Sequence, residues 1–125
     1  ILPGALIRND SGLFVCEVSG LRMGEGASGY HQSLTKSLHR VPIAHGEGRY
    51  YIDPDGLQEL QERGQVLFRY DDNPNGSTGD IAGVVSRNGR VLGMMPHPER
   101  AIDPRHGGTD GSALFASLAA AFVAA

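Results

Sequence analysis

Residues 81–100 read IAGVVSRNGRVLGMMPHPER, and this stretch decides how the chain folds locally. Two largely apolar runs, Ile81 to Ser86 and Val91 to Met95, flank Arg87-Asn88-Gly89-Arg90. An Asn-Gly pair between such runs predicts a β-hairpin with a type I′ turn, because that turn needs positive φ at both central residues. The second strand of this hairpin leads directly to His97.

His97-Pro98-Glu99 places a histidine and a carboxylate two residues apart at the end of this strand. A proline disfavours the helical conformation for the residue before it and favours an extended one. In an extended segment, residues i and i+2 point to the same side, so we expect the His97 ring and the Glu99 carboxylate to be neighbours. Such a pair supplies the base and the orienting group of a nucleophile–base–orienter triad. The alternative is a surface loop that matches the motif by chance.

The composition is that of an ordinary globular domain. At 125 residues, with 40% hydrophobic and 20% charged residues, the chain is long enough to bury a core. A net charge of −3 gives no reason to expect nucleic acid or an anionic membrane as a partner. Ile1-Leu2-Pro3-Gly4 lacks the basic and apolar segments of a signal peptide, so we expect none, and no apolar run approaches the roughly 20 residues of a membrane-spanning helix. The single cysteine cannot form an internal disulfide, so we expect a reducing, cytoplasmic location.

Further strands and helices are predicted from hydrophobic periodicity and turn signals. Asp53 should cap a helix that begins at Pro54 and ends at Gly64. Thr109 or Asp110 should cap a last helix with a buried stripe. The predicted elements are strands over 13–18, 41–45 and 65–70, a loop over 24–37, and a helical stripe of Leu114, Leu118 and Phe122. Strands with two inserted helices favour an α/β or α+β sheet with covering helices.

Cys16 is the only thiol, so it is the first candidate for a nucleophile. A catalytic cysteine of this kind sits on a sharp, glycine-flanked turn that exposes the sulfur and aims backbone N–H groups at the oxyanion. Cys16 lies instead in the predicted strand Phe14-Val15-Cys16-Glu17-Val18, with no glycine adjacent. We therefore predict that Cys16 is a small buried core residue without a catalytic role.

A second His-x-Glu phrase, Ala44-His45-Gly46-Glu47-Gly48, follows another predicted strand. Its glycines allow a ligand to approach the backbone closely. His45 and Glu47 are therefore candidates for a wall of the active site or for a contact with another protein. A metal site made of His45, Glu47, His97 and Glu99 is a less favoured alternative, because the spacing matches no zinc signature.

Asn73 and Asn75 complete the set of candidate residues near a substrate or partner. They belong to the phrase Asn73-Pro74-Asn75-Gly76-Ser77, which contains the residue types that dominate turns. A purely structural role as a turn is the alternative. Both interpretations place the phrase in a loop between two strands.

Several phrases follow one another along the chain in a recognisable order. They are Leu2-Pro3-Gly4-Ala5-Leu6-Ile7-Arg8-Asn9, Pro42-Ile43-Ala44-His45-Gly46-Glu47-Gly48-Arg49-Tyr50, Asn73-Pro74-Asn75-Gly76-Ser77, Ile81-Ala82-Gly83, Met94-Met95-Pro96-His97-Pro98-Glu99-Arg100 and Gly107-Gly108-Thr109-Asp110-Gly111. Together they closely resemble the glutamine amidotransferase subunit of phosphoribosylformylglycinamidine synthase, a class I, triad-type family of purine biosynthesis. His-Pro-Glu alone marks only the superfamily, whereas the other phrases in series point to this family.

The resemblance implies a flavodoxin-like α/β domain with covering helices. It also implies a reaction in which a cysteine thiolate attacks the side-chain amide of glutamine, ammonia leaves, and water hydrolyses the glutamyl thioester. Carried onto this sequence, His97 is the base of the Cys-His-Glu triad and Glu99 is its orienting partner. The family's nucleophile turn precedes the Leu-Pro-Gly phrase, so we expect residues 1–125 to be the C-terminal part of a single amidotransferase domain.

The same resemblance implies the partners. Ammonia would pass to a synthetase subunit, which uses ATP and magnesium to make formylglycinamidine ribonucleotide, with a small accessory subunit as a further candidate partner. We expect no cofactor and no metal in this chain. Without the nucleophile-bearing part, the chain should be inactive by itself.

Two other functions stay open at this point. The chain can be a truncated, non-catalytic relative that binds the synthetase as a scaffold module, or a metal-dependent hydrolase that uses both His-x-Glu phrases. A Gly-x-Cys-x-Gly phrase just upstream would decide for the amidotransferase, and a start codon there would decide for the module. Stoichiometric zinc would support the hydrolase.

Overall fold

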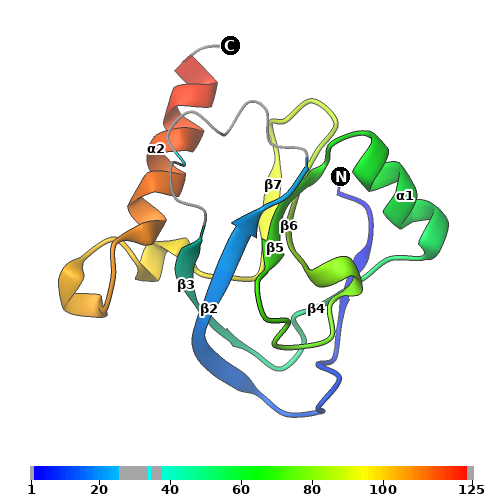
Figure 1. Cartoon of the computed structure of the whole chain (residues 1–125), viewed down its shortest axis with the longest axis horizontal. Coiled ribbons are helices and arrows are strands. Elements are labelled where there is room, and N and C mark those ends of the chain that lie inside the picture. The colour runs from blue at the N-terminus through cyan, green and yellow to red at the C-terminus, as the bar shows by residue number, and fades with distance from the viewer. Residues whose placement is uncertain (1, 26–33, 35–37, 124–125) are drawn as a thin grey trace.

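A computed structural model describes residues 2–25, 34 and 38–123. Its strands are β1 (Ala5–Ile7), β2 (Val15–Met23), β3 (His39–His45), β4 (Arg49–Tyr51), β5 (Val66–Tyr70), β6 (Ile81–Val85) and β7 (Leu92–Met94). Its helices are α1 (Pro54–Glu62) and α2 (Asp110–Val123), with short 3-10 turns η2 (Thr78–Asp80), η3 (Pro98–Arg100) and η4 (Pro104–His106). Figure 1 shows α1 and α2 on opposite sides of the main sheet. The predicted α/β class with covering helices is confirmed.

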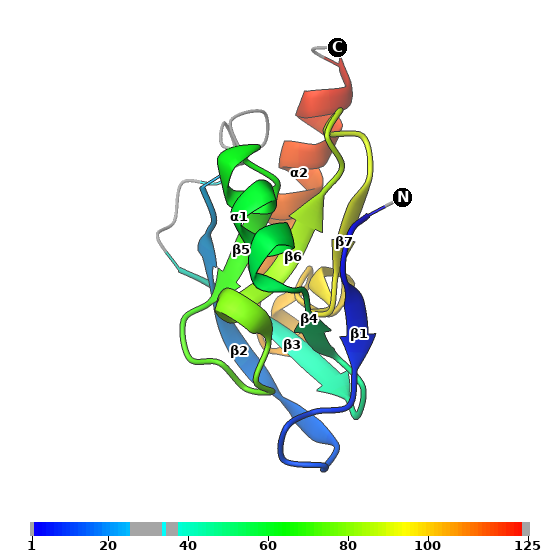
Figure 2. The same ribbon diagram turned by 90° about the vertical axis from the view of Figure 1, so that its right-hand side faces the viewer.

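The main sheet has the strand order β3-β2-β5-β6-β7, and β1 pairs with β4 in a second, two-stranded sheet. The pairings between described strands are all antiparallel, whereas a flavodoxin-like sheet is built on parallel strands. The turned view in Figure 2 shows how the strands twist across the molecule. β7 is an edge strand of the main sheet, and Leu2 lies directly against it, close to Gly93.

The two edges of the main sheet meet at one hydrogen bond. The backbone N–H of His97, just after β7, donates to the carbonyl oxygen of Pro42 in β3 at 2.8 Å. Pro42 lies opposite Val18 of β2. Because proline has no backbone N–H, these two residues form a non-hydrogen-bonded pair of the antiparallel ladder. The carbonyl oxygen of Pro42 therefore points away from β2, toward the free edge of β3. The sheet is curled, so the segment after β7 reaches this oxygen.

Two apolar clusters fill the two faces of this curled sheet. One lies between the sheet and α2 and is made of Leu21, Leu34, Val41, Ile43, Leu67, Phe68, Tyr70, Ala82, Val85 and Leu114. The other lies under α1 and is made of Tyr50, Ile52, Leu60, Val66, Ile81 and Val84. Successive side chains of a strand point to opposite faces, so β5 and β6 contribute to both clusters.

The predicted first helix is confirmed, including its cap. The Asp53 carboxylate accepts a hydrogen bond from Gly56 N at 2.7 Å, and Pro54 occupies the first turn. Gly64 adopts positive φ just beyond the helix. In α2, Leu114 is buried and Leu118 packs against the same cluster, whereas the side chain of Phe122 lies outside the described residues.

The predicted strands over 41–45 and 65–70 are confirmed, and the strand predicted over 13–18 begins at Val15 and continues to Met23. Most of the loop predicted over 24–37 lies outside the described residues. The hairpin of β6 and β7 is also confirmed, but the type I′ turn is wrong. Gly89 has φ of 67°, whereas Asn88 has negative φ and accepts hydrogen bonds from Ser86 Oγ and Arg90 N. A four-residue connection needs positive φ only at its glycine.

Gly111, in the first turn of α2, allows this helix to approach the turn that follows His97. Its N–H donates to the carbonyl of Ala101 at 2.8 Å, and a Cβ atom at position 111 would overlap the carbonyl of Pro98. An alanine usually stabilises a helix by about 1 kcal/mol relative to glycine. We expect Gly111→Ala to lower the free energy of unfolding by about 1–3 kcal/mol instead, because the added methyl group overpacks this contact.

Urea denaturation measures this effect, and Gly108→Ala is the matched control. A Cβ atom at Gly108 would meet no atom within 4 Å, so we expect its free energy of unfolding to stay within about 0.5 kcal/mol of the parent. A Gly111→Ala chain as stable as the parent would contradict the close approach of α2 to Pro98.

Candidate active site

His97 and Glu99 form the contact that the sequence predicts. Nδ1 of His97 lies 2.8 Å from Oε1 of Glu99. The predicted reason is wrong, however, because the segment does not stay extended beyond His97. Pro98 begins the 3-10 turn η3, and Arg100 N donates to the carbonyl of His97 at 3.0 Å. The two side chains therefore meet across a tight turn and not along one side of a strand.

The carboxylate fixes the chemistry of the ring. Burial opposes ionisation of Glu99, but hydrogen bonds from its own backbone N–H and from His97, with the positive charges of His97 and Arg100, lower the pKa of Glu99. An ionised Glu99 accepts the Nδ1–H of His97 and leaves Nε2 with its lone pair. The His97 side chain is 33% exposed, so Nε2 can act as a general base toward a group brought to it.

Cys16 does not match its predicted environment. It lies in β2 opposite Ala44, as a strand residue, but its side chain is exposed and not part of the core. Val15 packs against the apolar cluster next to α2, but Cys16, Glu17 and Val18 are exposed, so the core covers the beginning of β2 only in part. The hydrogen bond to Glu99 is the only one that the His97 ring makes within the described part of the chain. Cys16 is therefore not positioned as the partner of this base.

His45, the last residue of β3, and Asn75, in the turn before η2, come together and are both buried. Nε2 of His45 lies 2.8 Å from Nδ2 of Asn75, and their side chains are 5% and 0% exposed. Burial lowers the pKa of His45, and the positive charge of nearby His97 lowers it further. His45 therefore lies close to His97, the candidate base, but Nε2 of His45 is engaged in a hydrogen bond with Asn75.

The other predicted candidates have different surroundings. Glu47 is exposed. Oδ1 of Asn73 accepts hydrogen bonds from the backbone N–H groups of Asn75, Gly76 and Ser77, so Asn73 organises its own turn. That each of them lies near a substrate or a partner stays a prediction.

Sequence reasoning gave no role to Asn9, which is 3% exposed and joins two loops. Its Nδ2 donates to the carbonyl oxygens of Leu13 and His45 at 2.8 and 2.9 Å, and its Oδ1 accepts from Gly48 N at 3.3 Å. The available signal was its place in the turn-forming run Asn9-Asp10-Ser11-Gly12. Asn9 therefore holds the loop that carries His45.

The metal alternative finds no cluster to support it. Over residues 2–25, 34 and 38–123, no three His, Cys, Asp or Glu side chains form a group that could hold a metal ion. His45 and His97 direct one ring nitrogen each at Asn75 and Glu99, so the two His-x-Glu phrases do not converge on a shared centre.

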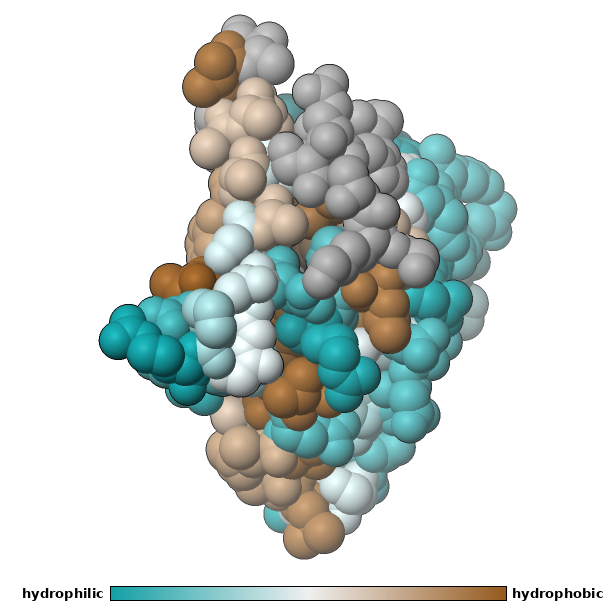
Figure 3. All heavy atoms as spheres, turned by 60° about the vertical axis from the view of Figure 1, so that its left-hand side comes forward, coloured by the Kyte–Doolittle hydropathy of each residue, from teal (hydrophilic) through white to brown (hydrophobic). Residues whose placement is uncertain are grey.

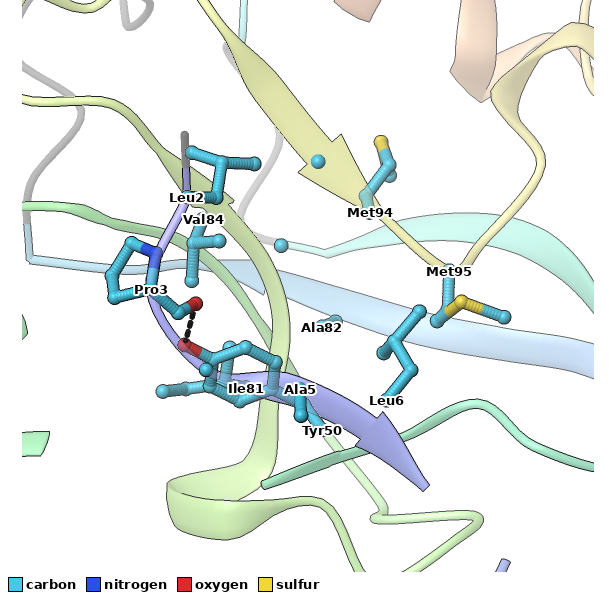
Figure 4. A pocket seen from close by; sticks show the side chains of 13 residues that line it. Leu2, Pro3, Ala5, Leu6, Tyr50, Ile81, Ala82, Val84, Met94 and Met95 are labelled. Atoms are coloured by element: carbon cyan, nitrogen blue, oxygen red, sulfur yellow. Dashed lines mark hydrogen bonds between the residues drawn. The ribbon is translucent and has the colours of Figure 1, made fainter. Parts of the chain in front are cut away.

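An apolar groove runs beside β7, the strand that leads to His97. It has a volume of about 310 Å³, and its walls are Leu2, Pro3, Gly4, Ala5, Leu6, Tyr50, Ile81, Ala82, Gly83, Val84, Gly93, Met94 and Met95. Figure 4 shows Met94 and Met95 on one side and Leu2 and Leu6 on the other, with Tyr50 donating to the carbonyl of Pro3 at 2.8 Å. Met95, two residues before His97 in the sequence, is one of its walls.

Apolar side chains are also exposed at the beginning of β2, the strand that carries Cys16, and directly before it. Phe14 and Val18 are 68% and 50% exposed. Figure 3 shows hydrophobic residues at the surface of one face of the molecule, broken up by hydrophilic ones.

The chain matches, over residues 3–108, the family described as the CobB/CobQ-like glutamine amidotransferase domain. It belongs to this family, which agrees with a base and its orienting carboxylate at the end of an apolar strand. Among curated proteins it is 54% identical to phosphoribosylformylglycinamidine synthase subunit PurQ of Jannaschia sp. (strain CCS1), and 47% identical to the subunit of that name from Roseobacter denitrificans. It covers 57% and 56% of these two relatives, which cover 100% and 99% of it.

A solved structure gives the same relationship. The chain aligns with a chain of the PurLQS structure from Thermotoga maritima with a TM-score of 0.80 and 40% identity, over 94% of this chain and 52% of that one. The chain therefore spans a little over half the length of the proteins that it resembles.

The buried position of His45 predicts a pH dependence of stability. Because the pKa of His45 is lowered on folding, the unfolded chain binds more protons than the folded chain below about pH 6.5. The stability that buried, neutral His45 contributes is fully present above the pKa of His45 in the unfolded chain. It is lost as pH falls through the pKa of His45 in the folded chain. We expect the free energy of unfolding to decrease from about pH 7 to pH 5, and His45→Leu to reduce that decrease.

Denaturant titrations at several pH values measure the dependence. His106→Leu is the control, because His106 is an exposed histidine in η4. If His45→Leu and His106→Leu have the same effect on the pH dependence, His45 does not carry the shifted proton equilibrium.

Proposed function

We propose that the protein containing this chain is a glutaminase that hydrolyses glutamine to glutamate and ammonia, and that the ammonia is used to make formylglycinamidine ribonucleotide in purine (IMP) biosynthesis. The observation that carries the proposal is the 2.8 Å contact between His97 Nδ1 and Glu99 Oε1 in a chain of the amidotransferase family. In this role His97 is the base and Glu99 its orienting group.

The proposed reaction has two steps, and in each of them His97 first accepts a proton and then donates it. A cysteine gives its proton to His97 Nε2, its sulfur attacks the amide carbon of glutamine, and the imidazolium returns the proton to the leaving nitrogen, which departs as ammonia. His97 then takes a proton from water, which attacks the thioester, and the released sulfur is reprotonated. Glu99 holds the ring with Nε2 forward in both steps.

The nucleophile is proposed to come from the part of the relatives that this chain does not cover. The only cysteine of the sequence, Cys16, is exposed on a strand and makes no hydrogen bond with the His97 ring in the described residues. The open edge of β7 and the apolar groove beside it lead to His97 and offer a place for a strand that carries the thiol. The isolated chain is accordingly proposed to be inactive.

The proposed partner is the synthetase subunit of phosphoribosylformylglycinamidine synthase, with a small accessory subunit beside it. The combined name PurLQS of the similar solved structure supports an assembly of this kind. ATP and magnesium would act in the synthetase and not in this chain. The proposed location is cytoplasmic. The helices in the described part of the chain lack the length and apolar character needed to cross a membrane.

Glutamine turnover by the full-length protein, with its partner present, tests the proposal. General bases contribute about 10²–10⁴-fold to a rate, so we expect His97→Ala to reduce kcat/KM by at least that factor. Glu99→Ala should cause a smaller loss, because Glu99 acts through His97. Cys16→Ala is the matched control and should leave turnover unchanged.

Equal losses in His97→Ala and Glu99→Ala would contradict the assigned order of roles. A full-length protein that binds the synthetase without hydrolysing glutamine would favour the scaffold function. Glutamine hydrolysis by residues 1–125 alone would contradict the proposed origin of the nucleophile.

A further inference from the structure

The side-chain amide of Asn75 has only one orientation that satisfies its neighbours. Its Oδ1 accepts hydrogen bonds from Ser77 N at 3.1 Å and from Ser77 Oγ at 2.6 Å. Its Nδ2 donates to the carbonyl oxygen of Gly48 at 3.1 Å. Reversing the amide would set an oxygen against the Gly48 carbonyl and an NH₂ group against the Ser77 N–H. The hydrogen bonds to Ser77 and Gly48 therefore determine which atom of the Asn75 amide is Oδ1 and which is Nδ2, independently of His45.

This orientation decides the protonation of His45. Nδ2 of Asn75 is a donor, so Nε2 of His45, at 2.8 Å, must be the acceptor. An imidazole that accepts at Nε2 is neutral and carries its hydrogen on Nδ1. The ring packs directly against Gly48, where a Cβ atom would overlap it. Nδ1, which carries this hydrogen, is buried without a hydrogen-bond partner in the described residues, and a second proton would have to sit on Nε2, against the NH₂ group of Asn75.

The charged groups around this pair of histidines are few. Glu99 binds Nδ1 of His97, and Arg100 follows it in η3. Tyr70 of β5 lies near Asn75, and burial raises the pKa of Tyr70 to about 12, so its phenol is neutral in the physiological range. Asp10 and Arg49 reach the turn of Asn75 at Gly76, and they carry opposite charges. The protonation of His45 is therefore the variable charge beside His97.

We propose that Asn75 is a positioning residue that acts through His45: it holds the ring as the neutral Nδ1–H tautomer, so that the imidazole beside His97 stays uncharged while His97 takes up and releases a proton. A charged His45 would repel the imidazolium form of His97, which both steps of the reaction require. The use of His97 as a base rests on the proposed function, whereas the tautomer of His45 does not.

Nitrogen-15 NMR of the full chain, with labelled histidine, tests the tautomer directly. We expect His45 to show a protonated Nδ1 and an unprotonated Nε2 from about pH 8 to below the titration midpoint of His97. A proton on Nε2 of His45 at neutral pH would overturn the proposal. Neither result involves glutamine, so this outcome is independent of whether the full-length protein proves to be a glutaminase.

Two matched substitutions test the action of Asn75 on His97. In Asn75→Asp, a carboxylate oxygen replaces Nδ2 and accepts a hydrogen bond from a proton on Nε2, so we expect His45 to gain a proton at Nε2 and become charged, and the NMR titration midpoint of His97 to move from its value in the parent chain. Asn73→Asp introduces the same charge in the same turn, and its Oδ1 can still accept the three backbone N–H groups. Its second oxygen loses the hydrogen bonds that Nδ2 donates to Ser77 O and Asp80 Oδ1, as the second oxygen of Asn75→Asp loses the one to Gly48 O. We expect it to leave His45 and His97 unchanged.

An Asn75→Asp chain in which Nε2 of His45 stays unprotonated, or in which the midpoint of His97 does not move, would overturn the proposal. Equal shifts in Asn75→Asp and Asn73→Asp would overturn it as well, because they would show a general effect of charge on the turn. If Asn75→Asp does not fold, the tautomer measured in the parent chain and the Asn73→Asp control still decide the outcome.

Discussion

The hydrogen bond from His97 N to the carbonyl of Pro42 is the interaction on which the site depends. It joins the segment after one edge strand, β7, to the opposite edge strand, β3, and so holds the main sheet in its curl. The same contact brings the candidate base to the strand that ends at His45. Proline at position 42 leaves no competing edge N–H, and Gly111 lets α2 close over the turn that follows His97.

The two histidines of this arrangement, His97 and His45, have different partners and different roles. His97 is half-buried after the edge strand β7, and the Glu99 carboxylate orients its ring. His45 is buried and oriented by an amide that accepts no proton from it. Each ring has one nitrogen in a hydrogen bond. The Glu99 carboxylate accepts from Nδ1 of His97 and leaves Nε2 free to act as a base, whereas the Asn75 amide donates to Nε2 of His45 and keeps that ring neutral.

Local signals predicted much of the fold, and non-local contacts explain the errors. The capped helix at Asp53 and the hairpin around Gly89 depend on neighbouring residues, so the sequence alone indicated them. The exposure of Cys16 depends on how far the core reaches under β2, which no local pattern encodes. His45 and Asn75 are separated by 30 positions, and their contact needs the whole sheet. The proximity of His97 and Glu99 was correctly predicted, but from an extended geometry that Pro98 ends.

In the proposed reaction, His97 serves a nucleophile other than Cys16. Peptide mapping by mass spectrometry tests this directly, after the full-length protein has reacted with an electrophilic glutamine analogue that captures the attacking thiol. We expect an adduct on a cysteine outside residues 1–125, formed quickly in the parent and slowly in His97→Ala. An adduct on Cys16, or labelling of the thiol at the same rate without His97, would contradict the proposed role of His97.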